Sequence, residues 1–183
     1  MNNQLSPVSW QTIFKKSLVW GIWLFLLAII QTSIFAVFRP FGAVPDLLLS
    51  AVIAIAIYDR ERTGVIAGIV GGSMADTLGG WGLSLSPLVY MLCAALFALL
   101  AYSVLRRDFL SWLIGIACSL IISGISSIIC AYSSISAAHF TVSHIFSELL
   151  IPQFFSSLLM GIPVYILTKL IWSRFFNTRE MEG

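Results

Sequence analysis

The sequence predicts an all-α integral membrane protein with six transmembrane helices packed into one bundle. Of its 183 residues, 59% are hydrophobic and 10% are charged, and the mean hydropathy is +0.98. A soluble domain carries about 25% charged residues, so this chain has too few to cover a surface in water. Apolar runs of about 20 residues recur along it, and such a run can cross a bilayer as a helix. The net charge of +2 and the lack of a basic patch interleaved with aromatics argue against nucleic-acid binding.

The apolar runs and the polar breaks between them divide the chain into spans and tails. Residues 1–16 are polar and end in two lysines, which predicts a cytoplasmic tail. The run over 17–38 contains no charge and would be about 33 Å long as a helix, enough to cross a bilayer. Further spans are predicted at about 43–58, 64–78, 85–105, 109–132 and 148–172, followed by a cytoplasmic tail over 173–183.

The basic residues predict the orientation of these spans. If both termini lie inside, nine of the ten Lys and Arg residues fall in cytoplasmic segments, and only Arg39 lies outside. This agrees with the excess of positive charge that cytoplasmic loops carry. The nine are Lys15, Lys16, Arg60, Arg62, Arg106, Arg107, Lys169, Arg174 and Arg179.

The stretch over 64–82 combines seven glycines with one carboxylate in an apolar setting. Gly64, Gly68, Gly72 and Asp76 recur every four residues, so on a helix they share one face. Small residues at this spacing let a neighbouring helix approach closely in a membrane. We therefore interpret the glycines as helix-packing residues and the stretch as the tightly packed centre of the bundle.

Three acids are candidate structural or partner-binding residues, and each has two readings. An ionisable group in a span is a functional-site hypothesis by default, but Asp76 could equally be a helix-end acid held by nearby polar groups. Asp46 follows Pro45 at a predicted helix start, where free N–H groups favour a carboxylate. Glu148 stands at the start of the last span and has the same alternative. Arg39 is a candidate ion-pair partner for Asp46 and Asp76.

The remaining candidates concern the membrane interface, metal binding and catalysis. Trp81 is a plausible interface anchor, because tryptophan is enriched where bilayer and water meet. His139 and His144 are five residues apart, a spacing that does not align two ligands on a helix, so no metal site is predicted. No serine has a recognisable base, and no nucleotide-binding loop is present, so we predict no cofactor and no enzyme activity. Cys93, Cys118 and Cys130 lie in apolar runs and are read as small buried residues.

The region over about 40–100 resembles the MreD family of bacterial rod shape-determining membrane proteins. The family pattern is a Pro-Asp pair opening a short apolar helix, a polar turn, a glycine-rich helix ending in Gly-x-x-x-Asp, and a glycine-rich segment before the next span. Here these features are Pro45-Asp46, Asp59–Arg62, Gly64–Gly72 with Asp76, and Gly79–Gly82. Tyr90 matches a frequent aromatic in the following helix. Met74 and Ala75 depart from the usual leucines before the acid.

The resemblance implies a role in the elongation machinery that builds the lateral peptidoglycan wall at the inner membrane. It implies a non-catalytic scaffold that binds MreC and acts with MreB, RodA and a class B penicillin-binding protein, surrounded by membrane lipid. The implied fold is similar to the six-helix substrate-binding subunits of energy-coupling-factor vitamin transporters, and such a subunit is the alternative function. The first span, SLVWGIWLFLLAIIQTSIFAVF, lacks the small-residue motif by which those subunits dock, which counts against the alternative. We expect glycine-mediated packing to hold open a rigid groove for MreC.

Overall fold

The structure is a computed structural model that describes residues 10–59, 61–79, 85–103, 108–134 and 150–175. These residues form six α-helices and one short 3-10 helix, which confirms the prediction of an all-helical chain for this part of the protein. The elements are α1 (Trp10–Val37), η1 (Pro40–Gly42), α2 (Leu47–Tyr58), α3 (Glu61–Gly79), α4 (Ser86–Ser103), α5 (Phe109–Ser134) and α7 (Ile151–Phe175).

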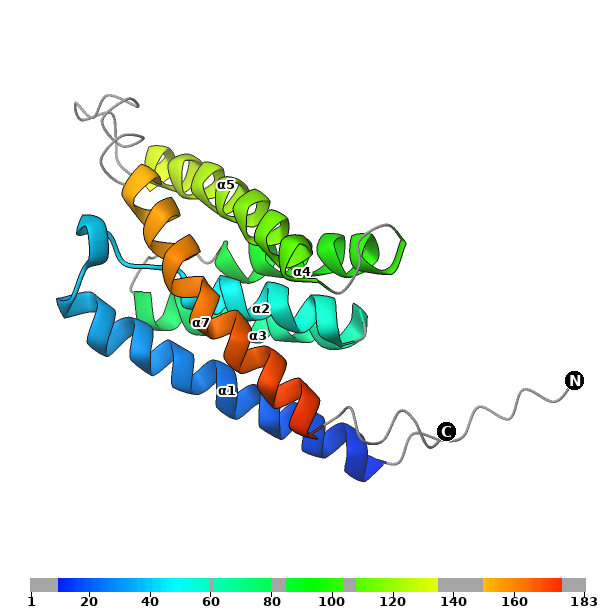
Figure 1. The fold of residues 1–183 in the computed structure, drawn as a ribbon. Helices are drawn as coiled ribbons and strands as arrows, with labels where there is room; N and C mark the ends of the chain where they lie inside the picture. Colours follow the sequence, from blue (N-terminus) through cyan, green and yellow to red (C-terminus); the bar gives the residue numbers. More distant parts are fainter. Residues whose placement is uncertain (1–9, 60, 80–84, 104–107, 135–149, 176–183) are drawn as a thin grey trace, which may run out of the picture.

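Helix α2 is the centre of the bundle. All twelve of its residues are buried, and α1, α3, α4, α5 and α7 all pack against it. Figure 1 shows α2 in the middle of the molecule, between α5 and α1, with α7 crossing beside it. Its sequence, LLLSAVIAIAIY, is apolar on every face, which is typical of a helix surrounded by others. The glycine-rich α3 is therefore a neighbour of the central helix and not the centre itself, and its Ile66 and Ile69 face outward.

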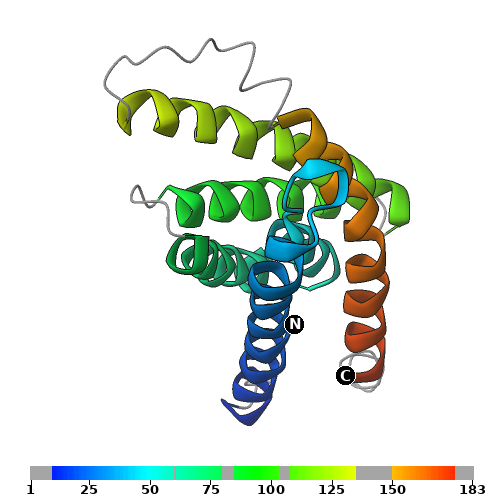
Figure 2. The same cartoon turned by 90° about the vertical axis from the view of Figure 1, so that its left-hand side faces the viewer.

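Helices α3 and α4 are the most closely packed pair among the described helices, and Figure 2 shows them side by side. A Cβ atom built on Gly68 would lie 2.8 Å from the carbonyl oxygen of Tyr90, and one built on Gly72 would lie 2.6 Å from the backbone nitrogen of Pro87. On the same stripe, Gly64 faces α2, where a Cβ would lie 2.8 Å from the Cα of Ala56. Because these obstacles are backbone atoms, a side chain would force the helices apart.

Three helices are long and apolar enough to cross a membrane by length and composition: Phe14–Val37, Phe109–Ser126 and Ile151–Phe175. Leu47–Tyr58 and Ser86–Ala101 are apolar but shorter. At about 1.5 Å per residue, α2 would be roughly 18 Å long, less than the roughly 30 Å hydrocarbon core of a bilayer. Its burial resolves this mismatch, since its neighbours and not lipid surround it. The division into six full spans stays a prediction.

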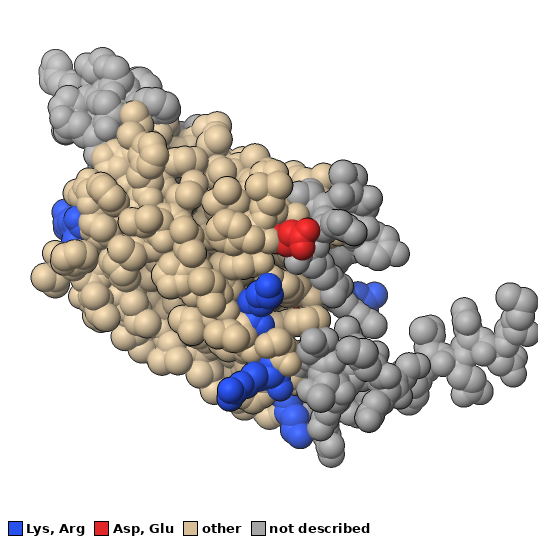
Figure 3. Space-filling model, in the orientation of Figure 1, with Lys and Arg blue, Asp and Glu red and all other residues tan. Residues whose placement is uncertain are grey.

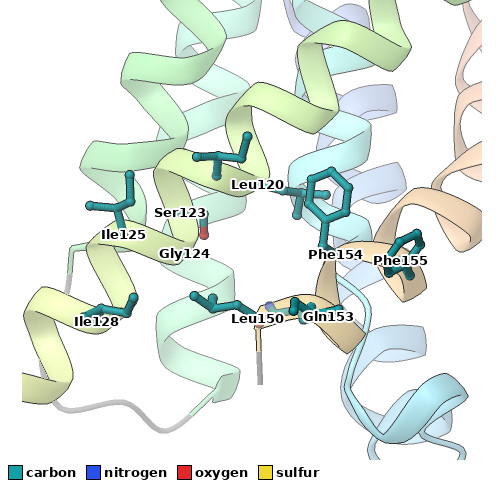
Figure 4. Close-up of a pocket in the computed structure, with 11 residues that line it drawn as sticks. Leu120, Ser123, Gly124, Ile125, Ile128, Leu150, Gln153, Phe154 and Phe155 are labelled. Carbon is teal, nitrogen blue, oxygen red and sulfur yellow. The ribbon is translucent and has the colours of Figure 1, made fainter. Parts of the chain in front are cut away.

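Helices α5 and α7 enclose a cavity of about 330 Å³ at the end of the bundle where α2 begins. Figure 4 shows its lining, in which Leu120, Ile125 and Phe154 are typical members and the polar side chains are Ser123 and Gln153. At Gly124 the neighbouring atom is the flexible tip of Leu150, so the helices are less tightly fixed here than α3 and α4 are.

Candidate functional site

The first turn of α2 begins at a buried carboxylate. The first N–H groups of any helix lack partners within the helix, and a side chain that accepts from them stabilises its start. Asp46 takes this role, because its carboxylate accepts a hydrogen bond from the backbone N–H of Leu49 at 3.0 Å. Pro45 is buried in front of it. Asp46 therefore occupies the helix-start position that its sequence context indicates.

Three other helices complete this arrangement. The Tyr90 hydroxyl on α4 lies 2.6 Å from each carboxylate oxygen of Asp46 and donates to that group. The backbone N–H of Asp46 donates to Oγ of Ser157 on α7 at 2.7 Å. Oε1 of Gln31 on α1 accepts from the N–H groups of Leu47 and Leu48 at 3.0 and 3.2 Å. We call the set Gln31, Asp46, Tyr90 and Ser157 the α2 cap; it joins α1, α4 and α7 to the start of α2.

Asp76 lies close to the α2 cap but takes no part in its hydrogen bonds. Its side chain is in the last turns of α3, is only 9% exposed, and interacts electrostatically with Tyr90. Tyr90 has a single hydroxyl proton, and that proton is directed to Asp46. Within the described part of the chain, Oδ2 of Asp76 has no hydrogen-bond partner. The structure thus brings both predicted acids to one end of the bundle, where Asp46 has hydrogen-bond partners and one oxygen of Asp76 has none among the described residues.

The other predicted site residues are placed as follows. Arg39 is exposed, and its Nε donates to the carbonyl of Ala36 at 3.3 Å. It forms no ion pair with Asp46 or Asp76, so the described residues give no support to that pairing. Trp81 and Glu148 fall outside the described residues, as do His139 and His144.

A second polar contact closes the opposite end of α2. Asp59 caps the C-terminus of the helix and is 8% exposed. A carboxylate is unfavourable there, because the free carbonyls carry partial negative charge. Lys16 on α1 offsets this with an ion pair of 3.2 Å, and Nε1 of Trp20 donates to the same carboxylate at 3.2 Å. Helix α1 is therefore bonded to both ends of α2.

Aromatic side chains join α2, α5 and α7 between the two ends. The hydroxyl groups of Tyr58 and Tyr165 are hydrogen-bonded to each other. The ring of Trp112 on α5 lies 4.9 Å from that of Tyr165, and its Nε1 donates to the Ser50 carbonyl of α2 at 3.2 Å. Such rings contribute contact area together with one directed hydrogen bond. They set the orientation of α5 and α7 on the central helix.

Sequence reasoning found Asp46 but missed the side chains that hold it. Tyr90, Gln31 and Ser157 are 44, 16 and 111 residues away from their partners along the chain. The available signal was the presence of polar side chains inside apolar runs, since a polar group in a bilayer needs a partner. That signal marks Gln31 and Ser157 as polar contacts but does not say what they contact.

These features define a class of protein: an all-helical membrane protein in which buried polar side chains join the helices around a short central one. Among the described residues, no group of three His, Cys, Asp or Glu side chains could hold a metal ion. The model of one family, rod shape-determining protein MreD, matches residues 12–171, a region that includes the whole α2 cap. The chain belongs to the MreD family, as the sequence resemblance predicted. No curated protein and no solved structure matches the chain.

Proposed function

We propose that this MreD-family chain is a non-catalytic scaffold of the bacterial elongation (rod) complex. It would bind MreC directly and support cell-shape maintenance and lateral peptidoglycan synthesis, with MreB, RodA and a class B penicillin-binding protein in the same complex. We place it in the inner membrane with both termini in the cytoplasm. The family supports the general role, that of a rod shape-determining membrane protein, and the partners are our proposal.

The observation that carries the proposal is that the buried polar side chains of the α2 cap bond between helices and do not line a cavity. Tyr90 and Ser157 bond to Asp46, and Gln31 bonds to the first N–H groups of α2, so the four residues join four helices at the start of α2. A small-molecule site would instead direct its few polar groups into a cavity. The cavity between α5 and α7 is lined by none of the four α2 cap residues. This use of polar groups favours a rigid framework over a transporter subunit.

Rigidity is the physical contribution that such a framework makes to binding. When a partner helix binds a rigid surface, the two proteins together lose less conformational entropy than when the surface is mobile. In our proposal Gly64, Gly68 and Gly72 set the spacing of α2, α3 and α4, and Asp46 fixes the end of α2. MreC would then dock on a surface whose shape does not depend on its own binding.

The test is affinity purification of the tagged protein from its native membrane in mild detergent, with the co-purifying proteins identified by mass spectrometry. We expect MreC to be recovered, accompanied by RodA and a penicillin-binding protein. Recovery of ATPase subunits with a coupling protein, or of a bound vitamin-like molecule, would contradict the scaffold and support the transporter alternative.

The α2 cap provides the matched variants for this experiment. Tyr90→Phe removes one hydroxyl from the α2 cap, whereas Cys118→Ser changes a position on α5 that is exposed and not buried as the sequence predicted. If the framework determines the binding surface, Tyr90→Phe lowers the recovery of MreC and Cys118→Ser leaves it unchanged. Equal recovery with both variants, at equal amounts of folded protein, would show that MreC binding does not depend on the α2 cap.

A further inference from the structure

The cavity between α5 and α7 opens on the surface of the bundle. Ile121 and Ile125 on α5 and Phe155 on α7 border it, and each of these side chains is more than half exposed. Both helices are long and apolar enough to cross a membrane, over Phe109–Ser126 and Ile151–Phe175. In a bilayer, exposed apolar side chains on such helices face the lipid chains, so the cavity opens toward hydrocarbon and not toward water.

The cavity is long and narrow. Its lining on α5 extends from Leu120 to Ile128, which is about 12 Å along a helix. Spread over that length, its volume of about 330 Å³ gives a cross-section of roughly 28 Å². A helix with its side chains is about 10 Å wide, or roughly 80 Å² in cross-section, and does not fit. Since a cavity of about 150 Å³ holds one benzene molecule, this one has room for a hydrocarbon chain of about twelve carbon atoms.

One polar side chain in the lining has a free amide. Gln153 is the third residue of α7 and reaches the cavity beside Leu150 (Figure 4). Within the described part of the chain, its amide forms no hydrogen bond. The 25 residues of α7 extend over about 37 Å, more than the roughly 30 Å of a hydrocarbon core. A residue so close to the start of α7 therefore lies near the level of the glycerol esters of surrounding lipids, where its N–H group can donate to an ester carbonyl.

The surroundings of the cavity are uncharged. Helix α5 and the first half of α7 contain no charged residue, and Figure 3 shows the surface over them without Lys, Arg, Asp or Glu side chains. The hydrophobic effect does not draw a chain from the bilayer into the cavity, because lipid tails are as apolar as leucine. A bound chain is favoured instead by contacts with lining atoms that an empty cavity leaves without neighbours, and by the hydrogen bond to Gln153.

We propose that the cavity between α5 and α7 binds one acyl chain of an ester-linked membrane lipid, with the Gln153 amide donating to the ester carbonyl. The chain lies against Leu120 and Phe154, and the headgroup stays outside the cavity. Because no charged side chain takes part, phosphatidylglycerol and phosphatidylcholine bind equally well. The bound chain fills the space that separates α5 from the start of α7. This site does not depend on the proposed role in the elongation complex.

The first experiment is a titration of the purified, delipidated full chain with phosphatidylcholine, followed by native mass spectrometry. Gly124→Leu places a side chain in the cavity, where only the flexible tip of Leu150 is close. Gly21→Leu makes the same exchange on α1, where a Cβ atom would meet nothing within 4 Å. We expect Gly124→Leu to bind the first lipid roughly tenfold more weakly, and Gly21→Leu to bind it as the original chain does.

The second experiment tests the hydrogen bond. Gln153→Leu keeps the apolar lining but removes the amide, which should weaken the binding of phosphatidylcholine roughly threefold to tenfold. An ether-linked phosphatidylcholine has no ester carbonyl, so the original chain should bind it as weakly as Gln153→Leu binds the ester-linked lipid. Gln153→Leu should bind the two lipids equally. If the loss in Gln153→Leu is the same for both lipids, the amide does not contact the ester.

Helical circular dichroism and gel-filtration profiles establish that each variant is folded. Equal binding by Gly124→Leu and Gly21→Leu would overturn the site, because the lipid would then bind elsewhere on the surface. Tighter binding of phosphatidylglycerol than of phosphatidylcholine would overturn it too. A photoreactive phenylalanine analogue in place of Phe154 should form a lipid adduct in the native membrane. An adduct with a protein alone would overturn the proposal and identify a partner segment as the occupant.

Discussion

At the scale of single residues, Tyr90 has the largest influence on the α2 cap, because among the described residues it supplies the only side-chain donor to the Asp46 carboxylate, which is 5% exposed. Tyr90→Phe keeps the ring but leaves Asp46 without that donor. Loss of a hydrogen bond to a buried charged group costs about 1.5–3 kcal/mol, so we expect the free energy of unfolding to fall by that amount. Denaturant titration in detergent measures the change, and an unaltered titration midpoint would contradict it.

Asp46 itself permits a graded series. Asn keeps an oxygen that can accept from the Leu49 N–H or the Tyr90 hydroxyl, whereas Ala removes the cap and leaves both donors unsatisfied. A helix start that loses its capping side chain to Ala is destabilised by about 0.5–2 kcal/mol. We therefore expect Asp46→Ala to unfold at a lower temperature than Asp46→Asn in the same detergent. Equal losses in both variants would show that the negative charge, which both lack, and not the hydrogen bonds, is what this position provides.

Replacing Asp76, unlike replacing Asp46, should not lower the stability of the folded protein. Its Oδ2 atom has no partner in the described part of the chain, and a buried polar atom in that state is a cost to the folded protein. Asp76→Asn should leave the free energy of unfolding unchanged or raise it by about 1 kcal/mol. Thermal unfolding of this variant beside Asp46→Asn makes the comparison. A clear loss of stability would mean that the Asp76 carboxylate has a structural partner; unchanged stability with lost MreC recovery would make it a partner-binding residue.

At the scale of helices, the glycine stripe of α3 allows a sharp comparison with a glycine on α1. A Cβ on Gly72 would meet Ser86 and Pro87 backbone atoms, whereas one on Gly21 would meet nothing within 4 Å. Overpacking costs about 1–3 kcal/mol, and Gly to Ala in an uncrowded helix stabilises by roughly 0.5–1 kcal/mol. Gly72→Ala should therefore lower the unfolding temperature and Gly21→Ala should raise it. A similar change in both would remove close packing as the explanation for the stripe.

The helices also show how far the sequence could predict the fold. The apolar runs predicted that the chain is helical, and the Pro45-Asp46 pair predicted a helix start, because both signals are local. The apolar residues on every face of α2 could have predicted its central position. The glycines of α3 instead led to the prediction that α3 is the centre of the bundle. The partners of Asp46 could not be predicted, since Tyr90 and Ser157 reach it only through the packing of α4 and α7.

At the scale of the whole molecule, the two ends of the bundle differ in charge and in polar contacts. The end where α2 begins holds two buried acids and one exposed arginine, Arg39. The other end holds Lys15, Lys16 and Arg174. Since basic residues favour the cytoplasmic side, the asymmetry predicts that the second end faces the cytoplasm. The α2 cap would then lie toward the outside, where MreC is expected.

Reporter fusions test this orientation. Fluorescent protein joined after Gly183 should be fluorescent, because it folds in the cytoplasm, and alkaline phosphatase joined there should be inactive. Alkaline phosphatase joined after Gly42, between α1 and α2, should be active, because that loop is expected outside. Exchanging Arg39 for Gln should strengthen the same pattern, since it removes the one basic residue on the outer side. Active phosphatase after Gly183 would contradict this orientation, because it would place the C-terminus outside. With the N-terminus inside, the chain would then have an odd number of spans. The basic end of α7 would also lie outside, against the excess of basic residues on the cytoplasmic side.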